Sequence, residues 1–575
     1  MALNLNVGVL GHVDCGKTSL VKALSSVLST ASLDKNPQSR ERGITLDLGF
    51  SAFTVAVPDH LPKDTYSSLQ FTLVDCPGHA SLIRTIIGGA QILDMMLLVV
   101  DVNKGMQAQT VECVVIAEAV MAKDDGSNII VVLNKIDLIP EAEREQKIDQ
   151  AKRDITAQLA RTKLSRASIV CCAAVVGGEK IAAAADGQMI DYETASVGVA
   201  EVAAELTQRA RLPDRRAKAP LYFAFDHCFS VRGVGTILTG TVLAGEVKVN
   251  QFVELPALRL QKKVKSMQMF RKPVTVARAG DRVGICLSGL DAKLLERGVA
   301  AAPGSIRPVT AAVALVRKVS VFSGLCRSGA YYHVSLGHAT AMATVTFFGA
   351  EELKNGWRAL IEADTKNNHS LVAEGWEEVW SLDDMASLPF PWGAEFAQQS
   401  ELLGQARVNS EGSVALGRGQ SEGHASPLQY CLLQFHSPVI TPPSSVVLGS
   451  RLDSMASGAG SGSTHADSSD YLAGAGEANC RIAFYGRLVG GAVDDGSKRT
   501  RPSDADGGLG FGTEAGQLKL FNEKVKTGCV FRVGGGSGTA ERGVGEGSTL
   551  EVYGKDLFKK ETNMSPFVGM LVQTE

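Results

Sequence analysis

A loop near the N-terminus limits the possible folds more than any other part of the chain. Residues 7–10 are apolar, and the loop after them reads Gly-His-Val-Asp-Cys-Gly-Lys-Thr before a helical pattern begins. Glycines let backbone N–H groups face a phosphate at the helix N-terminus, the lysine adds a cation, and the threonine hydroxyl can ligate Mg²⁺. The sequence therefore predicts a phosphate-binding loop made of Gly11, His12, Val13, Asp14, Cys15, Gly16, Lys17 and Thr18.

Two polar motifs follow two further apolar runs. In Asp75-Cys-Pro-Gly78, the carboxylate can hold Mg²⁺ through water and the glycine N–H can sense the γ-phosphate. In Asn134-Lys135-Ile-Asp137, the carboxylate can accept hydrogen bonds from both N1–H and the exocyclic amine of guanine. Adenine offers no matching pair of donors, and an unpaired buried polar group costs about 1–3 kcal/mol. The expected ligands are therefore GTP and Mg²⁺.

Apolar runs that alternate with helical patterns predict an α/β fold with a doubly wound, mostly parallel sheet. Its strands are expected at 7–10, 71–74, 95–100 and 129–133, and its first helix at 18–28. After residue 220, short β-branched runs broken by glycine predict β-barrel domains, the second with strands at 331–335, 342–348, 431–435 and 446–448. The expected domains are a GTP-binding domain at 1–213, a barrel at 217–305, a second barrel at 306–490 with insertions near 350–427 and 454–476, and a partial, truncated fourth domain at 491–575.

The insertion at 350–427 contains all four tryptophans of the chain, Trp357, Trp376, Trp380 and Trp392. Two interpretations stay open. The tryptophans belong either to a small local cluster that packs on the second barrel, or to an acidic, aromatic docking segment.

Length and composition indicate a multidomain cytoplasmic protein. At 575 residues the chain is too long for one hydrophobic core, and no apolar run is long enough to span a bilayer. The N-terminus shows no signal-peptide pattern. The 11 cysteines have neither a zinc spacing nor a disulfide framework, so we expect reduced thiols, mostly in the core. We therefore expect a cytoplasmic monomer that does not contact a membrane.

Charge is distributed unevenly along the chain. The formal net charge of −3 argues against a protein that coats nucleic acid by bulk attraction. Residues 218–305 nevertheless contain 13 Lys and Arg against 6 Asp and Glu, a surplus of 13 − 6 = +7. The first predicted barrel is thus locally basic.

Two more motifs resemble those of translational GTPases. Arg-Glu-Arg-Gly-Ile-Thr at residues 40–45 lies between the first two nucleotide motifs, and His79 directly follows Asp-Cys-Pro-Gly. The resemblance implies that Thr45 closes over the γ-phosphate and Mg²⁺, and that His79 orients the attacking water. It also implies that Val13 and Ile44 form the apolar gate that restrains His79.

The fifth motif of the guanine site is a weaker match. Cys172-Ala173-Ala174 resembles the usual Ser-Ala-Lys but lacks the lysine, so its contribution to stacking on the base stays open. No arginine finger is evident in the sequence either. Slow intrinsic hydrolysis and activation by a partner are therefore expected.

A GTPase domain followed by two β-barrels is similar to elongation factor Tu and its relatives, in which the aminoacyl end of tRNA lies between the GTPase domain and the first barrel. The segments 37–50, 226–230, 262–270, 294–298, 449–453 and 557–563 resemble, more specifically, the selenocysteine-specific elongation factor of eukaryotes and archaea. This resemblance implies that Asp226, His227 and Arg282 line the aminoacyl pocket. Arg282 would be the partner of the selenolate, and His227 a hydrogen-bond donor.

Charge supports the same interpretation at Arg282. The arginine stands where elongation factor Tu typically has an uncharged asparagine. A selenol is mostly ionised at neutral pH whereas a serine hydroxyl is neutral, so a positive pocket can distinguish the two. The alternative is that Arg282 simply pairs with Asp281 or Asp226 at the barrel surface, where such a pair contributes about 0–1 kcal/mol.

The resemblance implies a translation elongation factor that binds GTP and selenocysteyl-tRNA, delivers the tRNA to the ribosome at recoded UGA codons, and hydrolyses GTP there. It also implies contact with the RNA-binding protein of the selenocysteine insertion element. Two other functions stay open: a general elongation factor Tu-like carrier of elongator tRNAs, and an initiation factor 2 gamma-like subunit that binds initiator tRNA.

Overall fold

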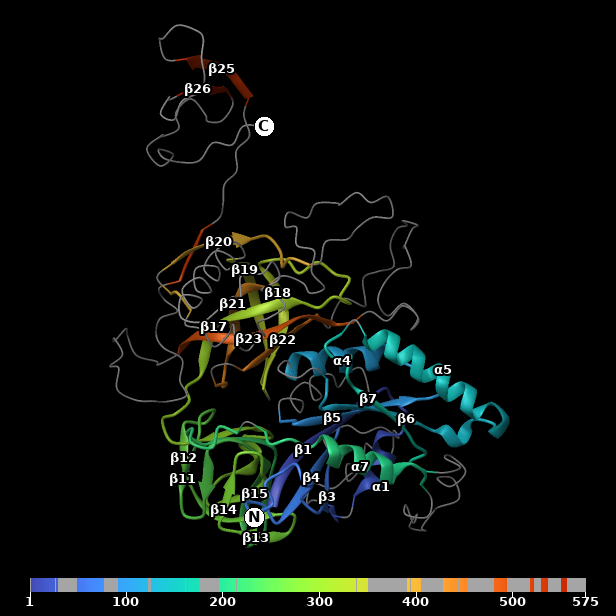
Figure 1. Ribbon diagram of the computed structural model, residues 1–575. Coiled ribbons are helices and arrows are strands. Elements are labelled where there is room, and N and C mark those ends of the chain that lie inside the picture. Colours follow the sequence, from blue (N-terminus) through green and yellow to red (C-terminus); the bar gives the residue numbers. More distant parts are fainter. Residues whose placement is uncertain are drawn as a thin grey trace. The chain divides into compact units, whose positions relative to one another are not determined.

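The computed structural model divides the chain into two units, Met1–Leu520 and Phe521–Glu575 (Figure 1). It describes residues 2–25, 27–28, 49–76, 92–121, 126–160, 162–175, 196–213, 215–337, 339–349, 390–392, 394–404, 428–442, 445–451, 480–493, 518–521, 529–535 and 550–555. The first unit contains an α/β domain and two β-barrels, which confirms the predicted fold class. The described part of the second unit is an antiparallel hairpin of β25 (Cys529–Gly535) and β26 (Leu550–Lys555).

The α/β domain is built on a seven-stranded sheet in the order β2-β3-β4-β1-β5-β6-β7. Its strands are β1 (Ala2–Gly11), β2 (Val27–Leu28), β3 (Gly49–Val55), β4 (Ser68–Asp75), β5 (Met95–Asp101), β6 (Ile129–Asn134) and β7 (Ser168–Cys171). The pairings from β4 to β7 are parallel, whereas β2 and β3 form an antiparallel edge. Strands β5 and β6 are buried along their whole length, as continuous apolar runs in a parallel sheet should be.

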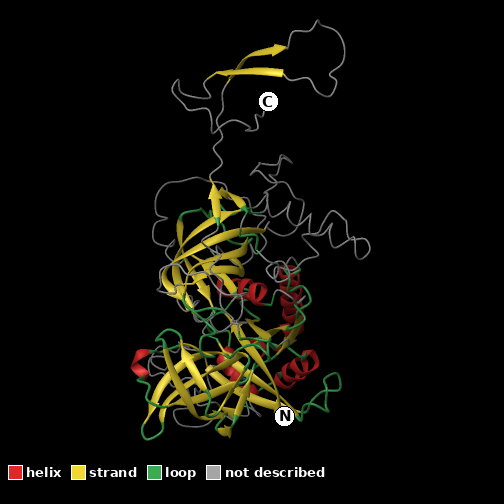
Figure 2. Cartoon of the chain, turned by 90° about the vertical axis from the view of Figure 1, so that its left-hand side faces the viewer, coloured by secondary structure: helices red, strands yellow, loops and turns green. Residues whose placement is uncertain are grey.

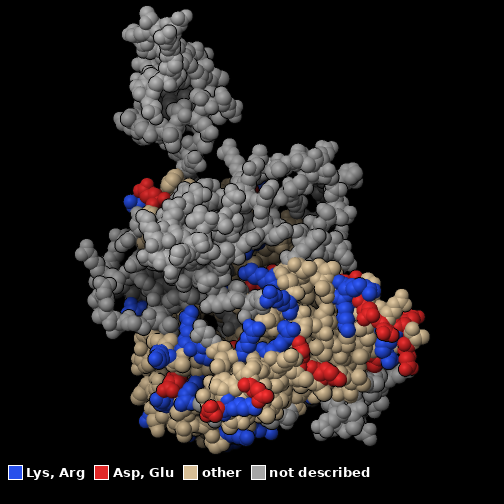
Figure 3. All heavy atoms as spheres, viewed as in Figure 1, with Lys and Arg blue, Asp and Glu red and all other residues tan. Residues whose placement is uncertain are grey.

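Helices cover both faces of this sheet, so it is doubly wound. The described helices are α1 (Lys17–Leu24), α4 (Ala108–Val120), α5 (Glu141–Leu159) and α7 (Val199–Arg209), with short 3-10 turns η2 (Ile136–Leu138) and η3 (Ala292–Leu294). One face packs against α1 and α7, and the other against α4 and α5 (Figures 1 and 2). Acidic and basic side chains intermingle on the exposed surface of α5 (Figure 3). None of the described helices is long and apolar enough to cross a membrane.

The helix after the phosphate loop is shorter than the sequence predicts. Apolar spacing predicts a helix over 18–28, but α1 ends at Leu24, and the edge strand β2 follows it. Ser25 explains the difference, because its backbone is extended and its hydroxyl donates to the Val21 carbonyl of the last helical turn. Serine side chains compete with the helical backbone in this way. The same hydroxyl contacts the Ser51 hydroxyl of β3 at 2.6 Å. The prediction of a helix to residue 28 was therefore wrong.

The first barrel closes on itself through the order β11-β16-β8-β9-β15-β12 and the additional pairing of β11 with β12. Its strands and those attached to it are β8 (Tyr222–Val231), β9 (Gly235–Ala244), β10 (Glu246–Lys248), β11 (Phe252–Leu255), β12 (Leu260–Met269), β13 (Lys272–Val274), β14 (Val276–Arg278), β15 (Arg282–Leu287) and β16 (Gly298–Ala301). Alternate residues of β8, β9 and β15 fill the interior, and the others face outward. The outward residues of these three strands are therefore available to a neighbouring domain or a ligand.

The second barrel closes in the same manner, through β18-β22-β23-β17-β21-β19 and the pairing of β18 with β19. Its strands are β17 (Val309–Lys318), β18 (Ala330–Leu336), β19 (Ala339–Phe348), β21 (Leu428–Val439), β22 (Val446–Ser450) and β23 (Ile482–Val493), with β20 (Glu395–Gln399) and β24 (Lys519–Phe521) added at one side. The four strands expected here from the sequence all lie within these elements. The ring of Trp392 packs edge-on against that of Phe390, with 4.7 Å between the ring centres, in an aromatic cluster on this barrel. This position agrees with the local-cluster interpretation for Trp392. The other three tryptophans, Trp357, Trp376 and Trp380, lie outside the described residues.

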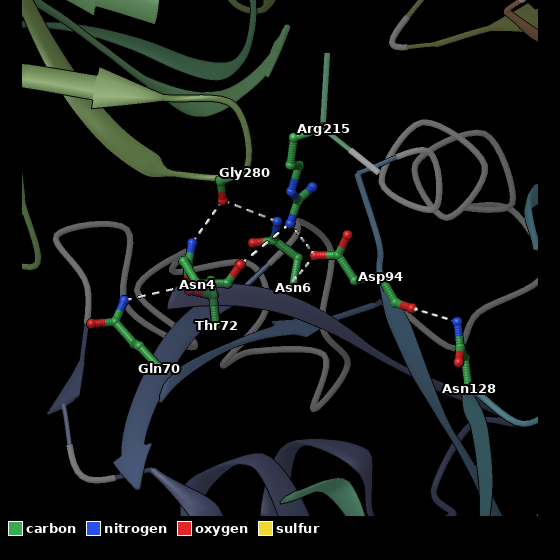
Figure 4. A network of polar contacts seen from close by, with 8 residues as sticks. All are labelled: Asn4, Asn6, Gln70, Thr72, Asp94, Asn128, Arg215 and Gly280. Atoms are coloured by element: carbon green, nitrogen blue, oxygen red, sulfur yellow. Dashed lines mark hydrogen bonds and ion pairs between the residues drawn. The ribbon is translucent and has the colours of Figure 1, made fainter. Parts of the chain in front are cut away.

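A polar network joins the α/β domain to the first barrel (Figure 4). The side-chain amides of Asn4 and Asn6, on β1, donate to the Gly280 carbonyl at 2.7 and 3.2 Å. Arg215, in the linker before the barrel, donates to the Asp94 carboxylate at 2.5 Å and to the Asn4 carbonyl at 3.3 Å. Gly280 lies two residues before Arg282, so this network anchors the start of β15.

Helix α4 joins the same domain to the second barrel. Glu112 receives hydrogen bonds from the Arg481 guanidinium at 2.7 and 2.9 Å, and the Ala119 carbonyl receives one from Arg487 at 3.0 Å. Apolar residues of α4 belong to the same hydrophobic cluster as the interior of the second barrel. The GTPase-like domain is therefore in direct contact with both barrels.

Candidate functional site

The phosphate loop connects β1 to α1 and depends on backbone conformations that favour glycine. Gly16 caps the helix with a φ of 93°, and a Cβ at this position would lie 2.2 Å from the Asn134 side chain. Gly11 has a φ of 149°, and its Cβ would lie 2.3 Å from the Val99 carbonyl oxygen. Neither position can hold a larger residue without a shift of the loop.

Lys17 and Thr18, at the start of α1, contact the loop and the end of β4. The Lys17 ammonium is 3.1 Å from the Gly11 carbonyl oxygen and 2.6 Å from that of His12, so the cation lies inside the loop. The Thr18 hydroxyl donates to the Asp75 carboxylate at 2.6 Å. Two oxygen ligands suited to Mg²⁺ therefore come together where α1 begins and β4 ends. This donor set fits a magnesium nucleotide.

A contact from α4 completes the loop. The Val13 N–H donates to the Gln109 side-chain oxygen at 3.2 Å. Gln109 lies in the first turn of α4, and its role was missed from the sequence because the contact spans 96 residues. The loop is thus held from the side by the helix that also contacts the second barrel.

Asn134 ties together the parts of the guanine site. Its side chain donates to the Cys15 carbonyl at 2.9 Å and accepts from the Ala174 N–H at 3.0 Å, so it links the phosphate loop to the segment that contains Ala173. In the segment 172–174 this contact is made by the Ala174 N–H and not by a side chain, so it does not need the lysine that the family usually has here.

Lys135 and Asp137 follow Asn134 at the same edge of the sheet. Lys135 has a φ of 69°, and its ammonium pairs with the Asp101 carboxylate at 3.0 Å. Asp101, at the end of β5, was not singled out from the sequence, although its position at a strand end was a signal. Asp137 lies in η2 and is half-buried. The remaining predicted residues of this site, Ile44, Thr45, Gly78 and His79, lie outside the described residues.

Buried thiols surround the nucleotide site. Cys15, Cys76, Cys113 and Cys172 are buried and free. Burial raises the pKa of each of these thiols, to about 12 for Cys113 and Cys172. They are neutral at physiological pH, which agrees with the expectation of reduced core cysteines.

A second candidate site lies on the outer face of the first barrel. Phe225 pairs with Gly240 and His227 with Thr239, so Asp226 is the extra residue of a bulge in β8. Bulges re-aim side chains and are frequent next to functional sites. Here the bulge brings the Asp226 carboxylate 3.0 Å from His227 Nδ1.

Asp226 also pairs with Arg282. Its two carboxylate oxygens lie 2.7 and 2.8 Å from the two terminal nitrogens of the guanidinium, and the two side chains are only 9% and 6% exposed. Burial alone would raise the pKa of the Asp226 carboxyl, but Arg282 and the hydrogen bonds from His227 and Arg282 outweigh burial and hold this pKa well below its usual range. Asp281 instead accepts a hydrogen bond from the Arg278 N–H at 2.8 Å. Arg282 does pair with an aspartate, but away from solvent.

Three further residues belong to this candidate site and were missed from the sequence. The Arg282 guanidinium carbon lies 3.1 Å from the centre of the Phe50 ring, which belongs to β3 of the α/β domain. Thr239 and Thr241 lie on β9, and Thr241 is directly opposite Arg282 in the strand pairing. The Thr241 hydroxyl is buried and has no hydrogen-bond partner among the described residues. Such contacts join distant elements, so spacing in the sequence gives no sign of them.

Known families match three parts of the chain. Residues 3–211 match the family described as "Elongation factor Tu GTP binding domain", and residues 235–299 match "Elongation factor Tu domain 2". Residues 313–458 match "Selenocysteine-specific elongation factor, eukaryotes, 3rd domain".

Individual proteins match over most of the chain. The chain is 39% identical to the selenocysteine-specific elongation factor of Mus musculus over 571 aligned residues. The aligned region covers 99% of this chain and 84% of the mouse protein. The selenocysteine-specific elongation factor of Methanocaldococcus jannaschii is 33% identical over 371 residues, or 64% of this chain and 71% of the archaeal protein. The crystal structure of translation elongation factor SelB from Methanococcus maripaludis, in complex with the GTP analogue GppNHp, shares the fold with a TM-score of 0.55 at 23% identity, over 84% of this chain and 78% of that one.

Proposed function

Because the chain belongs to the family of selenocysteine-specific elongation factors, and is therefore a GTP-binding translation factor with GTPase activity, we propose that its cargo is selenocysteyl-tRNA. The factor delivers this tRNA to the ribosome at recoded UGA codons and hydrolyses GTP there. The observation that supports the cargo is the buried Arg282 on the barrel face that meets Phe50 of the GTPase domain.

The proposal gives each residue of the nucleotide site a role. Lys17 binds the β- and γ-phosphates, Thr18 and Asp75 would hold Mg²⁺, and Asp137 reads guanine. When bound, Mg²⁺ neutralises charge on the phosphate oxygens. Asn134 keeps the loop and the base site in register through its bonds to Cys15 and Ala174.

The family resemblance supplies the proposed hydrolytic residues. His79 orients the attacking water, Thr45 closes over the γ-phosphate and also contacts Mg²⁺, and Val13 and Ile44 restrain His79 until the ribosome is engaged. Hydrolysis is then slow until the ribosome, as the activating partner, displaces the gate.

The proposed domain division follows the sequence borders for the GTPase domain at 1–213, the barrels at 217–305 and 306–490, and a partial fourth domain at 491–575. The last border moves toward the C-terminus, because β23 of the second barrel continues to Val493 and β24 at 519–521 pairs with the same sheet. The RNA-binding protein of the selenocysteine insertion element is the proposed further partner. The cytoplasm is the proposed location, because translation takes place there.

Sequencing of the tRNA retained on the GTP-bound protein tests the proposed cargo. The protein is loaded with a non-hydrolysable GTP analogue, incubated with total aminoacylated tRNA, and washed before the bound tRNA is sequenced. Enrichment of the selenocysteine tRNA is expected. Equal retention of all elongator tRNAs, or retention of initiator tRNA, would show that the cargo is different.

A further inference from the structure

Two threonines lie beside Arg282 on the outer face of the first barrel, and their hydroxyls differ. Thr239 and Thr241 are two residues apart on β9, so both side chains point to the same side of the sheet. The Thr239 hydroxyl donates to the Asp226 carboxylate at 3.5 Å. Thr241 is only 2% exposed, and its hydroxyl has no hydrogen-bond partner in the part of the chain that the structure describes. Thr241 thus has a buried donor that the fold leaves unused.

An unused hydroxyl in a buried position destabilises the folded protein. Water hydrogen-bonds to this group in the unfolded chain, and the fold supplies no replacement. A valine has the same shape and no hydroxyl, so it would not carry this penalty. Buried polar groups are normally hydrogen-bonded, and departures from such local rules are expected at functional sites. The hydroxyl therefore indicates a partner that is absent from the free protein.

The position of Thr241 indicates where this partner binds. Thr241 lies directly opposite Arg282 in the pairing of β9 with β15. Opposed residues on one face of an antiparallel pair have Cβ atoms about 4.5–5.5 Å apart. A ligand atom that lies against the Arg282 side chain is therefore within reach of the Thr241 hydroxyl. The residue opposite Thr241 on the other side is Ala224 of β8, which has no polar side-chain atom.

The anion of this face is already hydrogen-bonded by other groups. The oxygens of the Asp226 carboxylate lie 2.7 and 2.8 Å from the two terminal nitrogens of Arg282, and the carboxylate also accepts from Thr239. A further contact places it 3.0 Å from His227 Nδ1. Asp226 therefore does not use the Thr241 hydroxyl, which stays available to a ligand.

We propose that Thr241 is a specificity-determining residue of the aminoacyl pocket, and that its hydroxyl donates a hydrogen bond to the selenolate of bound selenocysteyl-tRNA. The inference rests on the proposed function and adds a neutral donor to the charge of Arg282. A selenolate is an anion that can only accept, so it suits a hydroxyl with a hydrogen to donate. Such a charge-assisted bond is about twice as strong as one between two neutral hydroxyls. Thr241 therefore favours selenocysteyl-tRNA over seryl-tRNA.

The affinity for one tRNA charged in two ways tests the proposal. The full-length protein, bound to a non-hydrolysable GTP analogue, is titrated at neutral pH with the selenocysteine tRNA charged with selenocysteine or with serine. Thr241→Val should raise Kd for selenocysteyl-tRNA at least about tenfold and Kd for seryl-tRNA about threefold or less. Thr241→Ser keeps the hydroxyl, so both Kd values should stay within about threefold of those of the parent.

Three results of this titration overturn the proposal. They are unchanged binding of selenocysteyl-tRNA by Thr241→Val, equal weakening of both aminoacyl forms, and a Thr241→Ser protein as defective as Thr241→Val. A parent protein without any preference for selenocysteyl-tRNA contradicts the proposed function instead.

The same tRNA charged with cysteine separates charge from shape. A cysteine thiol has an ordinary pKa of about 8.5, so it is mostly uncharged at neutral pH. Thr241→Val should therefore weaken cysteinyl-tRNA as little as seryl-tRNA, about threefold or less. Weakening as strong as that of selenocysteyl-tRNA would show that the hydroxyl does not distinguish an anion, and would overturn the proposal.

Thermal unfolding distinguishes a contact with the ligand from a structural one. Thr241→Val removes an unsatisfied group, so its Tm should equal or exceed that of the parent although it binds the cargo less well. The matched control is Thr236→Val on the same strand, because the Thr236 hydroxyl donates to the Leu290 carbonyl. This control should have a lower Tm and the parent's preference between the two aminoacyl groups. A lowered Tm for Thr241→Val, or a failure of this variant to fold, would mean that its hydroxyl has a structural partner and would overturn the proposal.

Discussion

At the scale of single residues, Asp226 and Arg282 depend on each other for stability. Arg282→Ala leaves the Asp226 carboxylate buried without its cation. Loss of one partner of a buried ion pair costs about 3–5 kcal/mol of unfolding free energy. The double variant Arg282→Ala with Asp226→Ala removes both charges and should recover most of this loss. Urea unfolding of the three proteins measures the difference, and a double variant as unstable as the single one would contradict the explanation.

The pH dependence of this loss also follows from the pair. In the parent the folded-state pKa of Asp226 is depressed, so its stabilising contribution is fully present above the unfolded pKa of about 3.9 and declines as pH falls below it. In Arg282→Ala, burial has no cation to oppose it and raises the pKa of the Asp226 carboxyl in the folded protein. The protonated Asp226 is then tolerated in acid, whereas its ionised form destabilises the folded state as pH rises. The stability gap between parent and variant should therefore widen from acid to neutral pH. A gap independent of pH would contradict this explanation.

Asp137 is expected to determine the choice of base. Asp137→Asn replaces the acceptor of two guanine N–H donors with an amide, which should cost about 1–3 kcal/mol of GTP binding. Xanthosine triphosphate has a carbonyl at C2 that can accept from the new amide, so its affinity should rise. Titration of both nucleotides against parent and variant measures the switch. An unchanged preference for GTP would remove Asp137 from base recognition.

At the scale of elements, α4 lies between the phosphate loop and the second barrel. Gln109 in its first turn accepts from the Val13 N–H, and Glu112, one turn later, binds Arg481. Gln109→Ala should weaken the hold on the loop by about 1 kcal/mol and so accelerate GDP release several-fold. Stopped-flow release of a fluorescent GDP measures this rate. The matched control is Gln150→Ala on the exposed side of α5, which should release GDP as the parent does.

The sequence predicted the elements better than their contacts. Strands β5 and β6 were predictable because a strand buried on both faces is apolar throughout. The end of α1 was not, because the Ser25 hydroxyl also contacts Ser51, a residue that becomes its neighbour only in the folded sheet. The family resemblance singled out Asp226, His227 and Arg282, and the structure brings these three side chains together. Phe50 was missed because its contact with the guanidinium arises from the packing of two domains.

At the scale of the first unit as a whole, two junctions hold the GTPase domain against the barrels. The first junction depends on two polar residues of β1, Asn4 and Asn6, which are buried. They are unusual there, because a buried parallel strand is normally apolar on both faces. Their amides share the Gly280 carbonyl, and Asp94 accepts from the Asn6 N–H at 2.8 Å and from Arg215. Two asparagines in an apolar strand were a signal that this part of the sheet meets polar backbone from another domain.

Arg215 is expected to keep the GTPase domain and the first barrel unfolding as one unit. Burial raises the pKa of the Asp94 carboxyl despite the Arg215 guanidinium beside it, so Arg215→Ala removes the main compensation for a poorly hydrated charge. The side chains of Arg215 and Asp94 are 23% and 12% exposed, which places the loss of unfolding free energy at the lower end of about 3–5 kcal/mol.

Differential scanning calorimetry of Arg215→Ala should show the barrel unfolding before the GTPase domain, and hydrogen exchange near Gly280 should accelerate. GTP affinity should stay unchanged, because the nucleotide binds at the other end of β1. Arg216→Ala, one residue along the same linker, is the control and should unfold as the parent does; if both variants behave alike, the ion pair does not hold the junction.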